Sequence, residues 1–487
     1  MRLADARLLD GSLVDIDVDG SSIARVSPAG STAAAGERIG LGGAAVVPGL
    51  WDSHTHMGQW ALFRARPSVL EAPTAAAAAL VAREAAATHP GQGPLVLVGM
   101  RDGLWPDAPS AALLDAATGD VPTLVISSDV HCSWPNTAMA RLLGRAPADV
   151  LFREDEAFDV LTLVDRMLDT AAVDRLVDDA LAVAASRGVV GVVDLDFDDA
   201  VGAWARGTRR TPARVRAGVY AAELELLVER GLRGGDALAG RAQVGPLKVI
   251  TDGSLGTRTA WTAEPYGHAH DALTTGVRTV GAAELERLLA RAGELGLDAA
   301  IHAIGDAAVT AAIDALERPG RGGRIEHAQL VAAADVPRMA RAGIVASVQP
   351  EHALDDRELT AALWVDRAHD AYRLRSFLEA GVVLSMGSDA PVTPLDPWLA
   401  IATAVTRTRG DEAPWRPEEA IGLEAAVAAS APTTIRAGQP ADLVVLDAAP
   451  PSAADVADDP NAAAARLRGM PVRATLLDGE AIFGALA

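Results

Sequence analysis

Eight short apolar runs recur through the middle of the chain, and stretches with helical character separate them. Near-continuous apolar strands that alternate with helices are typical of parallel strands buried on both faces. Eight such units predict an α/β fold, a distorted TIM (β/α)8 barrel, whose active site lies at the carboxyl ends of the strands. The predicted strands cover residues 44–47, 189–195, 214–219, 246–250, 298–302, 324–327, 344–348 and 382–386.

The spacing of these runs also predicts the domain organisation. The interval between the first run and the second is far longer than one helix requires, so we expect an inserted α/β subdomain at about residues 59–185. Each end of the chain has strand-like patterns, but too few at either end for a stable sheet. We therefore expect a composite β-sandwich domain of residues 1–45 plus 432–487, and a barrel domain of residues 46–431.

Composition narrows the class of partner. The chain has 65 acidic and 43 basic residues among 487, which gives a formal charge of −22. A field of this sign repels phosphate backbones and anionic lipid, so we expect no nucleic acid and no membrane partner. The single cysteine, Cys132, excludes an intrachain disulfide framework. The chain has no apolar stretch of bilayer length and no signal-peptide core, so we expect a cytoplasmic protein.

Residues with versatile chemistry follow the predicted strands. His54 and His56 lie two positions apart after the first strand, and such residues face the same side of an extended chain. His302 and His327 end two later strands, and Asp389 follows the last one. Neutral imidazole is the commonest metal ligand in proteins. The pattern therefore predicts a metal site at the mouth of the barrel.

Lys248, in the fourth predicted strand, is the only lysine of the chain, and all other Lys or Arg positions are arginine. A position that keeps its lysine can need an amine that loses its proton, which a guanidinium cannot do. A lysine amine held near two divalent ions can react with carbon dioxide to give a carbamate, with one oxygen for each ion. We therefore expect, as a hypothesis, that Lys248 is carboxylated.

Seven stretches carry a family resemblance, and they follow one another over nearly the whole chain: VVPGLWDSHTHM (46–57), LKVITDGSLGTRTA (247–260), IHAIGDAAV (301–309), RIEHAQ (324–329), SVQPEH (347–352), SMGSDAPV (385–392) and PADLVVLD (440–447). With them the chain resembles the amidohydrolase superfamily, in the amidohydrolase-3 or YtcJ-like group, which includes N-substituted formamide deformylases. The resemblance implies a distorted TIM barrel with a β-sandwich formed by both termini. It also implies a hydrolase with one or two divalent ions, usually zinc.

The resemblance assigns roles to particular residues. It implies six metal ligands: His54, His56 and Asp389 for one ion, His302 and His327 for the other, and carboxylated Lys248 as the bridge between the ions. Two of these six, Asp389 and Lys248, are also the implied catalytic residues. Zinc lowers the pKa of its bound water toward about 7, which supplies a hydroxide nucleophile. Asp389 would then act as general base and afterwards as general acid. A mononuclear site, with Lys248 in another role, stays open.

Four further residues are candidates for substrate contact: His131, Asp252, His352 and Trp105. The first matches a family position in the inserted subdomain, and the second begins a Gly- and Ser-rich loop after the Lys248 strand. The third follows the seventh strand, and the fourth could form part of an apolar wall. By strand alternation, Glu326 should point away from the mouth and support its neighbours.

The sequence thus predicts a metal-dependent hydrolase that cleaves a carbon–nitrogen bond of the amide type other than a peptide bond. An N-substituted formamide or another small N-acyl amide is the expected substrate. Two alternatives stay open: an esterase or cyclic amide hydrolase on the same site, and a non-catalytic scaffold without metal. Retention of all six ligand-type residues argues against the scaffold. A homo-oligomer is compatible with the sequence.

Overall fold

The computed structural model describes most of the chain. The described residues are 1–31, 36–89, 91, 93–127, 132–145, 151–153, 155–197, 199–210, 212–267, 274–318 and 321–486.

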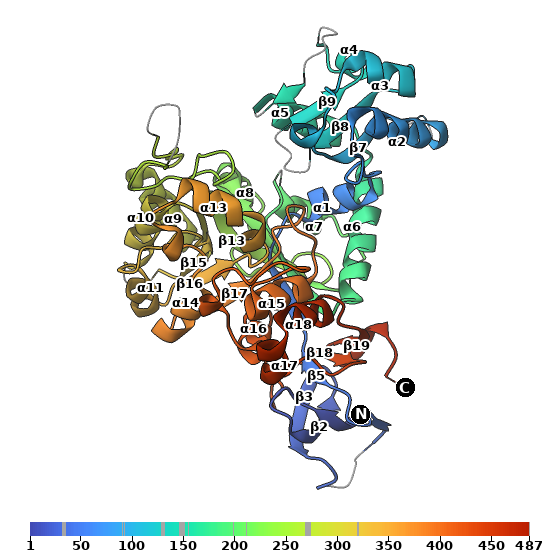
Figure 1. Ribbon diagram of the computed structural model, residues 1–487. Helices are drawn as coiled ribbons and strands as arrows, with labels where there is room; N and C mark the ends of the chain where they lie inside the picture. Colours follow the sequence, from blue (N-terminus) through green and yellow to red (C-terminus); the bar gives the residue numbers. More distant parts are fainter. Residues whose placement is uncertain are drawn as a thin grey trace. The chain divides into compact units, whose positions relative to one another are not determined.

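An eight-stranded parallel sheet forms the centre of the fold (Figure 1). Its strands are hydrogen-bonded in their sequence order, and each neighbouring pair is parallel. They are β6 (Leu50–Thr55), β11 (Val189–Asp194), β12 (Arg214–Tyr220), β13 (Ala242–Ile250), β14 (Ala299–Ala303), β15 (Gly323–His327), β16 (Val345–Val348) and β17 (Leu384–Met386).

The first and last of these strands meet and close the sheet into a barrel. An isolated parallel bridge joins Thr55 of β6 to Ala390 in the segment after β17. The amide of Asp389 donates to the carbonyl of His54 at 2.7 Å, and the amide of His56 donates to the carbonyl of Ala390 at 2.9 Å. These bonds lie at the carboxyl end of both strands.

Helices follow the strands and cover the outside of the barrel (Figure 1). In α9 (Ala282–Glu294), Leu285, Leu288, Leu289 and Ala292 are buried, and their spacing of three to four residues makes one apolar face. The other helices after the barrel strands are α7 (Ala200–Ala205), α8 (Leu224–Glu229), α10 (Asp306–Leu316), α11 (Val336–Ala342), α12 (His352–Asp355), α13 (Arg357–Leu363), α14 (Leu374–Ala380), α15 (Pro397–Thr406) and α16 (Leu423–Ala429).

Strands from both ends of the chain form two four-stranded sheets with the orders β3-β2-β1-β4 and β20-β19-β18-β5. Leu3 and Ile16 of one sheet and Leu443 and Leu476 of the other belong to one buried apolar cluster. The elements are β1 (Arg2–Arg7), β2 (Leu13–Asp19), β3 (Ser22–Pro28), β4 (Arg38–Gly40), β5 (Val46–Pro48), β18 (Leu443–Leu446), α17 (Ala453–Asp458), α18 (Pro460–Arg468), β19 (Val472–Leu477) and β20 (Glu480–Gly484).

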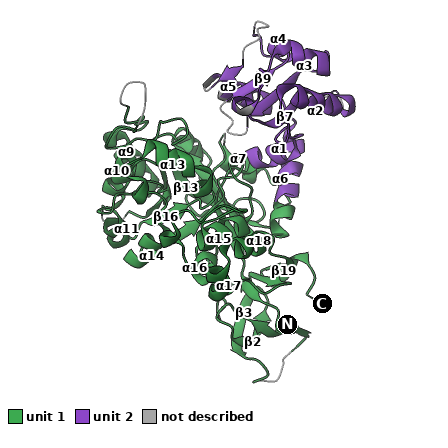
Figure 2. Cartoon of the chain, viewed as in Figure 1, with its two compact units in different colours: residues 1–57, 181–487 green, residues 58–180 purple. Residues whose placement is uncertain are grey.

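Residues 58–180 form a second compact unit, shown in purple in Figure 2. Its sheet has the order β10-β9-β8-β7, and its buried apolar cluster includes Leu97, Val125 and Trp134. The elements of this stretch are α1 (Met57–Ala65), α2 (Ala75–Thr88), β7 (Leu95–Met100), α3 (Ala111–Thr118), β8 (Thr123–Ser127), β9 (Cys132–Pro135), α4 (Thr137–Leu142), β10 (Phe152–Arg153), α5 (Asp155–Asp165) and α6 (Thr170–Ala185).

The fold class predicted from the sequence is confirmed, and seven of the eight predicted runs are barrel strands. The first run, 44–47, is the exception. The strand there, β5, pairs with β18 in a sheet of the terminal segments, and the first barrel strand is β6. Only Gly49 separates β5 from β6, so the sequence shows no turn or loop that would mark two strands. In the part of the chain that the structure describes, every helix is too short or too polar to span a bilayer.

Candidate metal centre

The six residues predicted to bind metal lie at the carboxyl ends of five barrel strands. They are His54 in β6 and His56 just after it, Lys248 in β13, His302 in β14, His327 at the end of β15, and Asp389 after β17. Five of them are buried, and the side chain of His302 is 16% exposed. The barrel therefore gathers, at one rim, side chains that are far apart in the sequence.

Three of these residues form a group that could hold a metal ion. One ligand atom from each of His54, His327 and Asp389 lies within 4.8 Å of the other two. His54 Nε2 is 3.4 Å from Asp389 Oδ1, and the ring centroids of His54 and His327 are 5.2 Å apart. Two imidazoles and a carboxylate are a donor set typical of catalytic zinc sites.

His56 and His302 extend this group on two sides. His56 Nε2 is 3.2 Å from Asp389 Oδ1. The ring centroid of His302 is 4.4 Å from that of His327, with an edge-to-face arrangement. His302 Nε2 also lies 3.4 Å from the carbonyl oxygen of Gly253. The structure thus brings all four predicted imidazoles together around the carboxylate.

Lys248 reaches the same place from β13. Its Nζ is 3.2 Å from His54 Nε2, and the residue is 2% exposed. Burial lowers the pKa of Lys248 from 10.5 to about 8, because an ammonium group loses its hydration in the barrel. The ammonium group therefore loses its proton more easily than that of a surface lysine. The neutral amine that results is the form that reacts with carbon dioxide.

Burial keeps the imidazoles neutral. It lowers the pKa of His54 to about 4 and that of His302 to about 3, and the charge of Lys248 adds to both shifts. Burial and the neighbouring His302 also lower the pKa of His327 well below its usual range. Neutral imidazole has a free lone pair, so these side chains can accept a cation at neutral pH without first losing a proton.

Asp389 is the carboxylate at the centre of the group. Burial by itself raises the pKa of Asp389, but the imidazoles of His54 and His56 more than offset burial and hold that pKa well below its usual range. Asp389 is therefore ionised at neutral pH. Its Oδ2 is 3.9 Å from His352 Nε2, a buried nitrogen that has no hydrogen-bond partner among the described residues. His352, predicted to contact substrate, thus lies at the centre.

Two of the site residues have an unusual backbone. His327 has φ 70° and Asp389 has φ 58°, both in the left-handed region that favours glycine. Such conformations cost about 1–3 kcal/mol each and persist only where the surroundings hold them, often at functional sites. Here they turn the side chains at the ends of β15 and β17 toward the centre.

Glu326 supports His54 from inside the barrel. Its carboxylate is fully buried, and Oε2 is 2.8 Å from His54 Nδ1. The same oxygen accepts a hydrogen bond from Ser347 Oγ at 2.6 Å. With Nδ1 held by Glu326, the imidazole of His54 presents Nε2 to Asp389.

The inward position of Glu326 differs from the expected one. Strand alternation predicts that Glu326 points away from the side on which His327 lies. The left-handed backbone at His327 interrupts this alternation, so the two adjacent side chains both face the inside of the barrel. A sequence pattern does not reveal such an interruption at a non-glycine residue.

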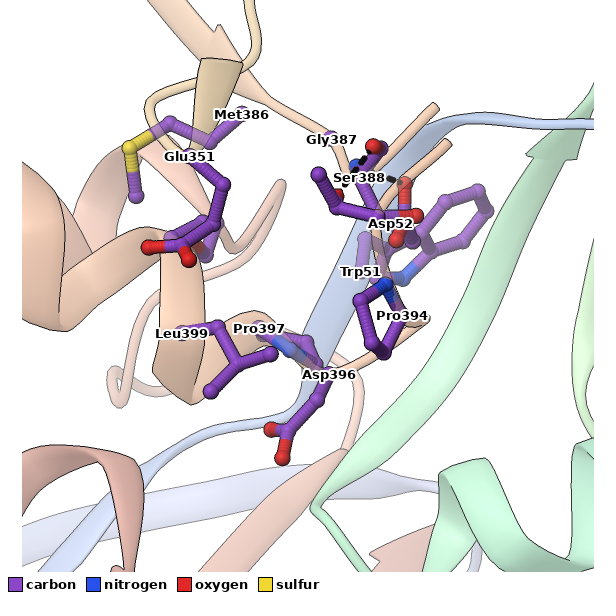
Figure 3. Close-up of a pocket in the computed structure, with 13 residues that line it drawn as sticks. Trp51, Asp52, Glu351, Met386, Gly387, Ser388, Pro394, Asp396, Pro397 and Leu399 are labelled. Carbon is purple, nitrogen blue, oxygen red and sulfur yellow. Dashed lines mark hydrogen bonds between the residues drawn. The ribbon is translucent and has the colours of Figure 1, made fainter. Parts of the chain in front are cut away.

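Asp52 links the two strands that close the barrel. Its Oδ1 accepts hydrogen bonds from the amides of His54 (3.1 Å) and Ser388 (2.9 Å), and Figure 3 shows the pair with Ser388. A pocket of about 10 Å³ beside them reaches Glu351 and the start of α15. This volume suits about one water molecule, so an amide substrate needs a different site.

Asp252 holds the loop after β13. Its carboxylate accepts hydrogen bonds from the backbone amides of Trp261 (2.9 Å), Ile304 (3.1 Å) and Gly305 (2.8 Å). Its Oδ1 is also 3.5 Å from His302 Nε2. Burial raises the pKa of Asp252 to about 7. These hydrogen bonds fix the loop against β14, and contact between Asp252 and substrate remains a prediction.

The other two predicted substrate residues belong to the inserted stretch. His131 lies outside the described residues. Trp105 packs edge-to-face on Trp134, with ring centroids 6.4 Å apart, and its indole nitrogen donates to the carbonyl of Ala72 at 2.9 Å. These contacts give Trp105 a packing role within residues 58–180, and its contact with substrate remains a prediction.

Two residues near the centre escaped the sequence interpretation. Gln349 Nε2 is 3.2 Å from His54 Nδ1; its place in the SVQPEH stretch was a signal, but nothing there distinguished it from its neighbours. Phe197, two residues beyond the predicted second strand, stacks on His56 with ring centroids 5.2 Å apart. Its apolar character gave no reason to place it at a metal site.

Comparisons with known proteins agree with this geometry. The model of the amidohydrolase family matches residues 37–483. Protein LONG AFTER FAR-RED 3 of Arabidopsis thaliana is 28% identical over 464 residues, covering 84% of this chain and 79% of that protein. YtcJ of Bacillus subtilis (strain 168) is 28% identical over 417 residues, covering 77% of this chain and 76% of its own length.

Two further similarities are narrower. The N-substituted formamide deformylase of Arthrobacter pascens is 29% identical over 258 residues, covering 48% of this chain and 45% of that enzyme. A metal-dependent hydrolase from Pyrococcus furiosus is similar in structure, with a TM-score of 0.78 and 24% identity over 92% of this chain and 99% of that one; this likeness is one of fold. The chain is therefore a hydrolase of the amidohydrolase family, in its YtcJ-like group.

Proposed function

We propose that this chain hydrolyses an N-substituted formamide or another small N-acyl amide with the help of zinc. The observation that carries the proposal is the group of His54, His327 and Asp389, whose ligand atoms lie within 4.8 Å of one another at the catalytic end of the barrel. The partial similarity to an N-substituted formamide deformylase supports the substrate class.

The residues of the centre fit a divalent ion. His56 Nδ1 and His327 Nδ1 are buried and have no hydrogen-bond partner among the described residues. Buried polar atoms are normally paired, and nitrogen donors beside a carboxylate suit zinc. A bound divalent ion acts as a Lewis acid, which acidifies water and polarises a carbonyl oxygen.

Lys248 supports the carboxylated form of the site, with one or two ions. Its amine lies 3.2 Å from His54 Nε2 and has a pKa of about 8. The neutral amine would attack carbon dioxide, forming an N–C bond and releasing one proton. The resulting carbamate is anionic and has two oxygens, so it would place a carboxylate-like ligand beside His54, where Lys248 otherwise offers one nitrogen.

Asp389 is the proposed proton carrier. It is ionised at neutral pH, and Oδ1 is 3.2 Å from His56 Nε2. In the proposed reaction the carboxylate takes a proton from the attacking water and returns it to the nitrogen of the leaving amine. His352 would donate a hydrogen bond to the bound substrate, since its Nε2 faces this carboxylate and has no other partner among the described residues.

A hydrolysis screen on zinc-loaded protein tests the proposal. The panel contains N-substituted formamides, the matching acetamides and simple esters of the same size. We expect amine release from the formamides, loss of activity after treatment with a chelator, and recovery when zinc returns. Faster cleavage of the esters would indicate an esterase, and an inert panel would overturn the assignment of amide hydrolysis.

A further inference from the structure

Phe197 is a large apolar side chain that the metal centre does not use. It lies just beyond β11 and is 45% exposed. Exposed apolar residues that stand alone are normal on proteins and need no explanation. The neighbours of Phe197 are what make it informative.

Two aromatic rings hold Phe197 in place. Its ring stacks on the imidazole of His56, with centroids 5.2 Å apart and an interplanar angle of 13°. The ring of Tyr220 is 5.1 Å away on a tilted plane. The Tyr220 hydroxyl donates to the carbonyl of Leu195 at 2.9 Å, so Tyr220 is anchored to the segment that carries Phe197. The orientation of Phe197 is therefore fixed before any substrate arrives.

Phe197 places an apolar surface directly beside the reacting groups. Phe197 stacks on the imidazole of His56, and Nε2 of that imidazole is 3.2 Å from Asp389 Oδ1. A second exposed apolar residue, Val392, is 58% exposed and lies three residues after Asp389, in the segment whose Ala390 carbonyl accepts a hydrogen bond from His56. A second exposed apolar residue thus lies on the segment that is hydrogen-bonded to the backbone of His56.

We propose that Phe197 determines specificity by stacking on a flat, unsaturated apolar group of the substrate. An aromatic ring whose position is fixed by neighbouring rings and which keeps much of its surface open can receive a second ring at low entropic cost. The substrate class is then an amide that carries an aryl group close to the amide bond. This inference rests on the proposed function, because it assumes that the amide is cleaved at the adjoining metal centre.

The test compares substrates that differ only in the ring. On the amine side these are N-(2-phenylethyl)formamide and N-(2-cyclohexylethyl)formamide, and on the acyl side N-methylphenylacetamide and N-methylcyclohexylacetamide. N-methylformamide has no ring and serves as the reference substrate. The variants are Phe197→Leu, which removes the ring but keeps apolar bulk, and Phe197→Trp, which keeps an aromatic ring. Phe483→Ala is the control: it removes a half-buried phenylalanine from β20, a strand of a terminal sheet outside the barrel.

We expect the wild-type chain to prefer the phenyl compound of one pair. Phe197→Leu should lower that phenyl-to-cyclohexyl ratio of kcat/KM by about 5- to 10-fold, mainly through KM. Phe197→Trp and Phe483→Ala should keep the ratio, and Phe483→Ala should cleave N-methylformamide as the wild type does. The pair that shows the preference identifies the side of the amide that faces Phe197.

Two outcomes would overturn the inference. One is a ratio unchanged by Phe197→Leu, and the other is an equal loss on all substrates, including N-methylformamide, which would indicate a general disturbance of His56. Failure of the proposed function looks different, because the wild type would then cleave none of the amides. In that case, binding of the same phenyl and cyclohexyl pairs, measured by ligand-observed NMR, gives the ratio without turnover.

Discussion

Lys248 is the most informative single residue of the chain, because it is the only lysine and all the other Lys or Arg positions are arginine. The structure places its amine in the metal centre, 3.2 Å from His54. A positive charge alone could come from arginine, so the chemistry proposed for this position requires the amine itself.

Replacement of Lys248 by arginine should therefore abolish the metal centre while it keeps the charge. We expect kcat/KM to fall by more than about 100-fold, beyond the usual cost of losing a residue that only supports a ligand. Zinc per chain should fall with it. Both quantities are measured on the same preparation, by a formamide assay and by elemental analysis. Full activity with full zinc content in Lys248→Arg would rule out the carboxylated bridge.

The carboxyl group of Asp52, beside the metal centre, makes the stability of the folded chain depend on pH. Burial raises the pKa of Asp52 from 3.8 to about 7. The folded chain therefore holds the proton of Asp52 more tightly than the unfolded chain does. The contribution of this proton to the free energy of unfolding is fully present below pH 3.8 and is lost as the pH rises through 7. The shift corresponds to a free energy of unfolding of about 4 kcal/mol.

Asp52→Asn tests this dependence in metal-free protein. Asparagine is neutral at every pH and can keep the acceptor oxygen for the amides of His54 and Ser388. Between pH 4 and pH 8, the wild type should lose about 4 kcal/mol relative to the variant, as measured by urea unfolding. All other titrating groups are shared and cancel. A difference that does not change with pH would mean that Asp52 is already ionised in the folded chain at pH 4.

At the scale of elements, the closure of the barrel between β6 and the segment after β17 positions the centre. Gly387 lies at this closure. A Cβ at position 387 would lie 2.6 Å from the amide nitrogen of His54, 2.9 Å from its Cβ and 3.0 Å from Asp52 Oδ1. Real Cβ atoms do not approach backbone so closely, so the two strands can meet only where a glycine stands.

Gly387→Ala should therefore separate β6 from β17. We expect a loss of about 1–3 kcal/mol in the free energy of unfolding from overpacking, together with weaker zinc binding, since His54 must move. Gly293→Ala is the matched control: nothing lies within 4 Å of a Cβ there, and in α9 alanine should be neutral or stabilise by about 1 kcal/mol. Equal zinc affinity and stability in both variants would show that the closure tolerates a methyl group.

The same scale explains what the sequence could predict. Apolar runs with helices between them identified seven barrel strands, because a strand buried on both faces needs apolar residues throughout. The first strand was missed where Gly49 carries the chain from β5 to β6: its amide donates to Asp442 at 2.8 Å, while a Cβ there would lie 2.6 Å from Val190. That crossing is a tertiary contact, which periodicity does not record.

For the candidate site, the sequence pointed to residues by type and by strand end. His54, His327 and Asp389 come together as expected, because the parallel strands deliver their carboxyl ends to one rim. That Glu326 and His327 face the same side depends on the left-handed backbone at His327. The role of Asp252 depends on backbone amides of a later loop. Neither interaction has a sequence signature.

At the scale of the whole molecule, the chain separates into two compact units, one of them made of residues 58–180. This second unit has its own sheet and its own apolar cluster, in which Trp134 is 1% exposed. The indole nitrogen of Trp134 donates to the carbonyl of Ser110 at 2.9 Å, inside the same unit. We therefore propose that the inserted stretch folds as a subdomain.

Trp134→Ala should destabilise that unit alone. Removal of a fully buried tryptophan costs about 3–5 kcal/mol. Hydrogen exchange followed by mass spectrometry should show faster exchange in residues 58–180, with β13 to β16 and the zinc content unchanged. Parallel acceleration across the barrel strands would mean that the two units unfold as one.

The central claim is that this chain holds a catalytic metal ion through His54, His327 and Asp389. Zinc per chain, measured by elemental analysis on the wild type, on His327→Ala and on His369→Ala, tests it most directly; the side chain of His369 is 71% exposed and lies outside the group. The account predicts at least one zinc in the wild type and in His369→Ala, and a parallel loss of zinc and amide hydrolysis in His327→Ala. A His327→Ala protein that keeps both its zinc and its activity would contradict it.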